Sequence, residues 1–172
     1  DSVGAFMLSD AAAITDARAA FATGTVHAWY VADEPSPQYS AKVKARSDLL
    51  RANFPGVPTV ISYYDVTTLN QVVAAADIFA LDIYPSRFAF DPALIPALAA
   101  KADSLGLTYW GVIGAFSAAN YPWPTDMQLQ AMVAQWRATR QSGWLTYLWN
   151  PALAAHPTLA TIIKAANDTV IG

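Results

Sequence analysis

Short apolar runs alternate with alanine-rich stretches along the whole sequence, and this alternation is the feature that most limits the possible folds. The apolar runs carry β-branched and aromatic residues, which favour strands, whereas the stretches between them have helical composition. The predicted strands are Val3–Leu8, Val26–Ala32, Thr59–Tyr64, Ile78–Ile83, Tyr109–Phe116 and Trp144–Trp149. The predicted helices are Ala11–Ala22, Gln38–Asn53, Thr68–Ala76, Pro92–Ser104, Asp126–Gln141 and Pro157–Thr169.

Local signals mark several of these helix boundaries. Asp91-Pro92 and Thr125-Asp126 are plausible helix starts, and Gly24, Gly56, Gly106 and Gly143 each follow a predicted helix end. Strands that alternate with helices indicate a parallel sheet in which the helices are the crossover connections.

Residues 1–172 are therefore predicted to form one α/β domain of the TIM-barrel-like (βα)n type, with about six βα units. A full eight-unit barrel usually needs about 250 residues, so the barrel is expected to be reduced or partial. The alternative is a doubly wound open sheet, but no glycine-rich nucleotide loop follows the first predicted strand.

Composition excludes several classes of function. The net charge is −3 and the ten Lys and Arg residues are scattered, so no basic face is available for a nucleic acid. The apolar runs fall short of the roughly 20 residues of a membrane span. With no Cys and only His27 and His156, neither a metal site nor another cofactor is expected. The chain starts at Asp1 without a signal peptide and is rich in Trp and Tyr, so we expect a mature, secreted protein that acts on polymers.

The strongest local signal is the segment Trp29–Pro35, in which Asp33 and Glu34 end an apolar strand. Successive side chains on a strand point to opposite faces, and Glu34 shares a face with Ala28 and Ala32. Small residues followed by a polar one suit a barrel interior that opens into a pocket. A carboxyl group at the rim of an aromatic pocket has its pKa raised, as a general acid requires. The alternative is that both acids form a solvated strand end or cap a helix.

Two further strand ends carry acids. Asp82 and Tyr84 share a face of the run Ile78–Tyr84, and Asp82 is a candidate general base, sugar-hydroxyl acceptor or partner of Arg87. Asp65 follows Tyr64 and either completes a carboxylate pair with Glu34 or caps a helix that starts near Thr67.

Aromatic residues crowd the later strand ends. Flat aromatic rings stack on the apolar faces of sugars, although most aromatic side chains simply belong to the core, which is the expectation for Trp110, Trp136 and Trp144. The candidate substrate-binding residues are Asp33, Tyr64, Tyr84, Tyr121, Trp123, Trp149 and Asn150.

Several of these segments resemble the (βα)8-barrel glycoside hydrolases. Val26–Pro35 resembles their fourth strand, which often reads apolar–Trp–Tyr–x–x–Asp-Glu-Pro, and the resemblance implies that Glu34 is the general acid/base. Ala76–Pro85, Tyr109–Phe116 and Gly143–Asn150 resemble strands six, seven and eight. The retaining enzymes place a nucleophilic Glu at the end of strand seven, whereas Val112–Phe116 carries no carboxylate. If the protein is a hydrolase, its mechanism is then either inversion, in which the two carboxyl groups lie farther apart, or an unusual one.

Three functions follow as hypotheses. The first is a secreted glycoside hydrolase of a poly- or oligosaccharide that uses Glu34 with Asp82 or Asp65. The second is a carbohydrate-binding pseudoenzyme with the same fold. The third, a barrel enzyme for small metabolites, is disfavoured because no Schiff-base Lys or phosphate loop stands out. An incomplete barrel exposes the strands at Val3 and Trp144, which we expect to pair with each other or to be covered by another chain, such as a second copy.

Overall fold

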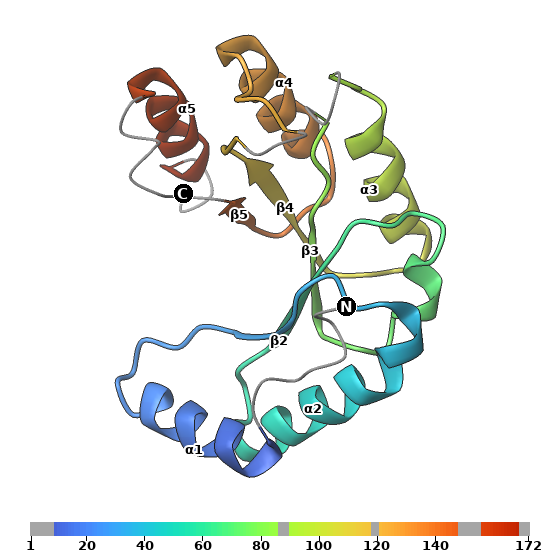
Figure 1. The fold of residues 1–172 in the computed structure, drawn as a ribbon, viewed down its shortest axis with the longest axis vertical. Coiled ribbons are helices and arrows are strands. Elements are labelled where there is room, and N and C mark those ends of the chain that lie inside the picture. Colours follow the sequence, from blue (N-terminus) through green and yellow to red (C-terminus); the bar gives the residue numbers. More distant parts are fainter. Residues whose placement is uncertain (1–8, 86–89, 118–120, 148–155, 169–172) are drawn as a thin grey trace. The chain divides into compact units, whose positions relative to one another are not determined.

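The computed structural model of the protein describes residues 9–85, 90–117, 121–147 and 156–168, in which strands and helices alternate (Figure 1). The strands are β1 (Trp29–Ala32), β2 (Thr59–Tyr63), β3 (Ile78–Leu81), β4 (Tyr109–Gly114) and β5 (Trp144–Tyr147). The helices are α1 (Asp10–Phe21), α2 (Ser40–Asn53), α3 (Leu94–Ser104), α4 (Asp126–Arg137) and α5 (Pro157–Asp168), with short 3-10 helices η2 (Pro37–Tyr39) and η3 (Leu69–Gln71).

The strands form one sheet in the order β1-β2-β3-β4-β5, and β1 pairs with β2, and β4 with β5, in parallel. The predicted fold class is thereby confirmed as an α/β fold of the partial TIM-barrel type. The predicted strand Val3–Leu8 lies outside the described residues. No described helix is both long and apolar enough to cross a membrane.

The chain divides into two compact units, Asp1–Phe79 and Ala80–Gly172. In the first unit, α1 and α2 lie side by side in blue and cyan (Figure 1). Asp10 of α1 accepts a hydrogen bond from Arg46 of α2 at 2.8 Å. The ring of Phe54, at the end of α2, packs against Trp29 of β1 at 4.9 Å between centroids. This cluster partly covers one side of β1, where Trp29 and Val31 are half-buried against the helices.

In the second unit, α4 packs closely on β4. Trp136 is fully buried and donates a hydrogen bond from Nε1 to the carbonyl oxygen of Val112 at 3.1 Å. The close approach depends on Gly111, where a Cβ would lie 2.7 Å from the indole of Trp136. Trp136 is therefore a core residue, as predicted. The predicted start of α4 is also confirmed, because Thr125 and Gln128 form a reciprocal capping box.

The predicted helix over Thr68–Ala76 is wrong. Only the 3-10 helix η3 forms there, and turns follow it. The segment contains Asn70, Val72 and Val73, which are poor helix formers. Its apolar side chains nevertheless reach the core, since Leu69, Val72 and Ala75 are fully buried. An irregular connection therefore replaces a helical one between β2 and β3.

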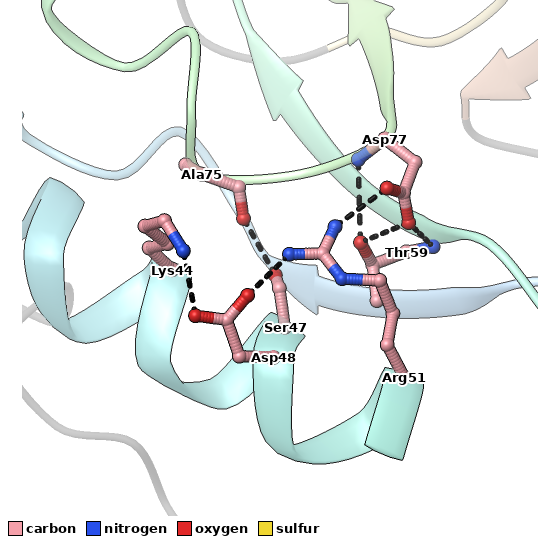
Figure 2. A network of polar contacts seen from close by, with 7 residues as sticks. All are labelled: Lys44, Ser47, Asp48, Arg51, Thr59, Ala75 and Asp77. Atoms are coloured by element: carbon pink, nitrogen blue, oxygen red, sulfur yellow. Dashed lines mark hydrogen bonds and ion pairs between the residues drawn. The ribbon is translucent and has the colours of Figure 1, made fainter. Parts of the chain in front are cut away.

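Asp77 joins that connection to β2 and α2 (Figure 2). Its Oδ2 accepts hydrogen bonds from the backbone nitrogen and the hydroxyl of Thr59, both at 2.8 Å, and its Oδ1 accepts one from Arg51 at 2.5 Å. Burial, the largest single influence, raises the pKa of Asp77, but the bonds from Thr59 and Arg51 together outweigh it and hold the pKa below its ordinary value. Asp77 thus joins three segments of the first unit.

We predict that Asp77→Asn lowers the free energy of unfolding by about 1–3 kcal/mol at pH 7, because it weakens several charge-assisted hydrogen bonds at once. The folded pKa of Asp77 is lower than the unfolded value of about 3.9. The stabilisation is thus fully present above that value and is lost as the pH falls through the folded pKa. Urea unfolding of both proteins at pH 7 and at about pH 2.5 should show the difference shrink in acid.

Asp48→Asn is the matched control, since Asp48 also binds Arg51 but makes its other bond to Lys44 of the same helix. Its side chain is 48% exposed, against 36% for Asp77. We expect that substitution to destabilise the protein less than Asp77→Asn does, because solvent screens an exposed ion pair. Equal losses in the two variants, or a pH-independent loss in Asp77→Asn, would contradict the assignment.

Candidate active site

The acidic segment Asp33-Glu34 lies in a bend that directly follows β1. The strand ends at Ala32, so the alternation of side chains that selected Glu34 over Asp33 does not extend to either residue. Both side chains are exposed. Among the described residues, Glu34 is the one residue other than glycine with a positive φ, at 42°. Non-glycine residues with this backbone conformation are uncommon and concentrate at functional sites.

A hydrogen-bond chain holds this bend against β2. Ser62 donates from its hydroxyl to Oδ1 of Asp33 at 2.7 Å and accepts from the backbone nitrogen of Glu34 at 3.0 Å. Tyr30 donates its phenol hydroxyl to the same oxygen of Asp33, also at 2.7 Å. Because β1 and β2 are parallel, their carboxyl ends lie at the same edge of the sheet. The edge therefore presents Asp33 and Glu34 on a fixed backbone.

Asp65 lies just beyond the end of β2 and caps the turn that follows. Its Oδ1 accepts hydrogen bonds from the backbone nitrogen and hydroxyl of Thr67 at 2.8 and 2.7 Å, and its Oδ2 accepts one from the hydroxyl of Thr68 at 2.8 Å. The bond from the Thr67 hydroxyl is the largest cause of a lowered pKa for Asp65, and burial opposes it only in part. The capping contact that the sequence offered as one alternative is present, although it leads into η3.

Tyr64, next to Asp65, keeps about half of its surface exposed. Its ring stacks on that of Tyr63 at 6.5 Å with 28° between the planes. The buried ring of Tyr63 therefore supports the half-exposed ring of Tyr64 at the end of β2.

In the second unit, Asp82 and Tyr84 follow the end of β3 at Leu81. Asp82 is only 8% exposed, which makes it the one acidic side chain among the buried described residues. Arg87, its candidate partner, lies outside the described residues. As with Glu34, the strand ends too early for alternation to set the direction of these side chains.

Tyr84 belongs to a cluster of four aromatic rings formed with Phe116, Tyr121 and Tyr147. Its ring centroid lies 4.9 Å from that of Phe116, 5.7 Å from that of Tyr121 and 6.0 Å from that of Tyr147. Gly114, the last residue of β4, is paired with Tyr147 of β5. A Cβ at Gly114 would lie 2.5 Å from the Tyr84 ring. Thus Tyr84 occupies the space that a side chain at the end of β4 would need.

The remaining aromatic candidates divide into two groups. Trp123 packs against His156 with 4.2 Å between ring centroids and 34° between the ring planes, close to the starts of α4 and α5. Trp149 and Asn150 lie outside the described residues. In the described part of the chain, no three acidic, His or Cys side chains are grouped as metal ligands.

Reasoning from the sequence missed Ser62. Phe116 and Tyr147 stand among the aromatic residues at the later strand ends, but the sequence did not select them as candidate site residues. For Ser62 a signal existed, because it is a polar residue inside the otherwise apolar run Val60–Tyr63, and buried hydroxyl groups need partners. Which partner it finds depends on the register between β1 and β2. For Tyr147 the register of β4 and β5 was needed in the same way.

Neither a protein-family model nor a curated protein matches the sequence. Among solved structures, a provisionally assigned alpha-L-fucosidase from Bacteroides thetaiotaomicron VPI-5482 has a similar fold, with a TM-score of 0.58 and 12% sequence identity. The match covers 79% of this chain and 53% of that chain, so this chain spans about half of its length. A provisionally assigned beta-galactosidase from Bacteroides fragilis has a TM-score of 0.48 and 13% identity over 70% of this chain and 22% of that chain. The first similarity supports the fold alone.

We predict that Gly114→Ala lowers the free energy of unfolding by about 1–3 kcal/mol, because the new methyl group overlaps the ring of Tyr84. The same substitution in a Tyr84→Leu background should cost less, since the smaller side chain leaves room. A thermodynamic cycle of the four proteins measures the difference. An unchanged cost of Gly114→Ala in the Tyr84→Leu background would show that the ring is not the obstacle.

Proposed function

We propose that the protein is a glycoside hydrolase in which Glu34 is the general acid. The single observation that carries this proposal is the conformation of Glu34 after β1. An exposed glutamate is held at a positive φ by a hydrogen bond from its own backbone nitrogen to a buried hydroxyl on the neighbouring strand. A surface acid with no role does not require such a backbone, whereas catalytic groups depend on fixed placement.

The fold supports the same proposal. In barrels built from βα units, the chemistry takes place at the carboxyl ends of the strands. Glu34 follows β1 at that end, in a segment that resembles the acid/base strand of the barrel glycosidases. The solved structure with the TM-score of 0.58 also carries the name of a fucosidase, as a provisional assignment.

The arrangement at β4 argues against a retaining mechanism that uses a nucleophile there. Gly114 has no side chain, and the ring of Tyr84 fills the adjoining space. The retaining double displacement needs two carboxyl groups about 5 Å apart, one of which attacks the sugar. We therefore propose inversion, in which a second carboxylate activates water.

Asp65 lies in the same unit as Glu34 and is the acid to weigh as that second carboxylate. Its pKa is lowered, chiefly by the hydroxyl of Thr67, which makes it a weak base and a good cap. When activity and urea unfolding are both measured, we therefore expect Asp65→Asn to reduce stability more than turnover.

The same observation at β4 favours a second function, a carbohydrate-binding protein without hydrolytic activity. A protein of this kind would keep the aromatic side chains that stack on sugars and would need no carboxylate at Gly114. Under either function we propose a poly- or oligosaccharide ligand encountered outside the cell.

Glu34→Gln is predicted to lower the release of reducing sugar by about 10²–10⁴-fold while binding of the polysaccharide is retained, because the amide cannot donate a proton to the leaving group. The measurement is reducing-sugar release over a panel of plant, fungal and bacterial polysaccharides, with affinity measured in parallel. Asp16→Asn, which changes an exposed carboxylate of α1, is the control and should keep wild-type activity. Binding without release by the wild type would favour the second function, and full activity of Glu34→Gln would contradict the first.

A further inference from the structure

Ser62 of β2 contacts both residues of the acidic bend, although it is buried and itself 3% exposed. It lies one residue beyond Ile61, which is paired with Ala32, the last residue of β1. Ser62 is therefore level with the bend at the point where the parallel ladder ends. Its hydroxyl bonds to the side chain of Asp33 and to the backbone of Glu34 at the same time.

The two bonds of this hydroxyl have a fixed direction. A serine hydroxyl has one proton, and a carboxylate can only accept hydrogen bonds. Ser62 must thus donate to Asp33, which leaves its lone pairs for the backbone N–H of Glu34. Tyr30 donates to the same Oδ1 of Asp33, so the carboxylate is held between two hydroxyl groups. Asp33 orients the hydroxyl of Ser62, and Ser62 in turn holds Glu34.

Local preferences do not explain the backbone of Glu34. A left-handed conformation is disfavoured for a residue with a long side chain. Pro35, the next residue, favours an extended conformation at Glu34 instead. Tertiary contacts therefore select the observed φ, and the bond from the Glu34 nitrogen to Ser62 acts directly on this peptide unit.

We propose that Ser62 is a positioning residue that fixes the direction in which the Glu34 carboxyl group leaves the sheet edge. The proposal rests on the proposed function of Glu34 as the general acid. Ser62 does not contact the substrate, and it acts only through the backbone of Glu34. Asp33 then has an orienting role towards Ser62 besides any contact with a sugar.

The sequence provides an unusual probe, because Glu34 is the only glutamate in the chain. Cell-free synthesis with ¹⁵N-labelled glutamate gives a protein with a single glutamate amide signal, that of Glu34. Its hydrogen-exchange rate reports the bond to Ser62 without any substrate. The kinetic constants on the polysaccharide that the wild type cleaves report the effect on catalysis.

Ser62→Ala is expected to speed exchange of the Glu34 amide more than about tenfold and to lower kcat by about 10–100-fold with KM nearly unchanged. Ser62→Thr, which keeps the hydroxyl, should restore both. Ser62→Cys fills the buried space but bonds weakly, so it should fold and still behave like Ser62→Ala.

Ser47→Ala is the matched control. Ser47 of α2 is also buried, in the same unit, and donates its hydroxyl to the carbonyl oxygen of Ala75 at 2.5 Å. Removal of that hydroxyl should lower stability and leave the Glu34 amide and kcat unchanged. If Ser62 acted only in folding, Ser62→Ala and Ser47→Ala would have the same effects on stability, on exchange of the Glu34 amide and on kcat.

The outcomes separate this proposal from the proposed function. Fast amide exchange with unchanged kcat would overturn the positioning role and leave Glu34 as the acid. Unchanged exchange in both Ser62→Ala and Ser62→Cys would overturn the proposed hold on the backbone. An inactive wild type with a protected amide would show that the proposed function has failed, and the positioning role with it.

Discussion

β2 is the strand on which the first unit depends, because all of its residues are buried and its Thr59 and Ser62 hydroxyl groups are bonded at opposite ends. A fully buried strand must satisfy every hydroxyl group inside the protein. Thr59, at the start, bonds to Asp77, and Ser62, near the end, bonds to Asp33 and Glu34. The first set of bonds joins β2 to α2 and to the start of β3, and the second fixes the acidic bend. The two ends of β2 thus have different roles: one supports stability, and the other holds the bend that carries the proposed general acid.

The parts of the fold that arise from local composition were predictable from the sequence. The apolar runs from Val26 onward predicted the strands, and helical composition with capping residues predicted most of the helices. The capping box of Thr125 and Gln128 is an example, because its hydrogen bonds form within a single turn of the chain. The failure at Thr68–Ala76 has a physical cause. Three alanines suggested a helix there, but the two valines and Asn70 weaken it, and packing of Leu69 and Val72 does not require one.

The candidate site was predictable in position but not in conformation. The residues Asp33-Glu34-Pro35 identify the end of β1, yet the expected alternation stops at Ala32, and the positive φ of Glu34 has no signal in the sequence. Ser62 shows the same limit, since its partners are 28 and 29 residues away in the chain. Gly114 in the second unit is a further example of this limit. The sequence does not explain why a glycine ends β4, whereas the structure places the ring of Tyr84 where a side chain would lie. Contacts of this kind depend on strand register, which composition does not specify.

Glu34 is proposed to donate a proton to a leaving group, and the most direct test varies that leaving group. A suitable substrate is the 2,4-dinitrophenyl glycoside of the sugar that the wild type releases. Its dinitrophenolate leaving group departs without protonation, whereas the glycosidic oxygen of the natural substrate needs a general acid. The kcat/KM of Glu34→Gln should therefore stay within about tenfold of wild type on the aryl glycoside and fall by about 10²–10⁴-fold on the natural substrate. Equal losses on both substrates would contradict the assignment of Glu34 as the general acid.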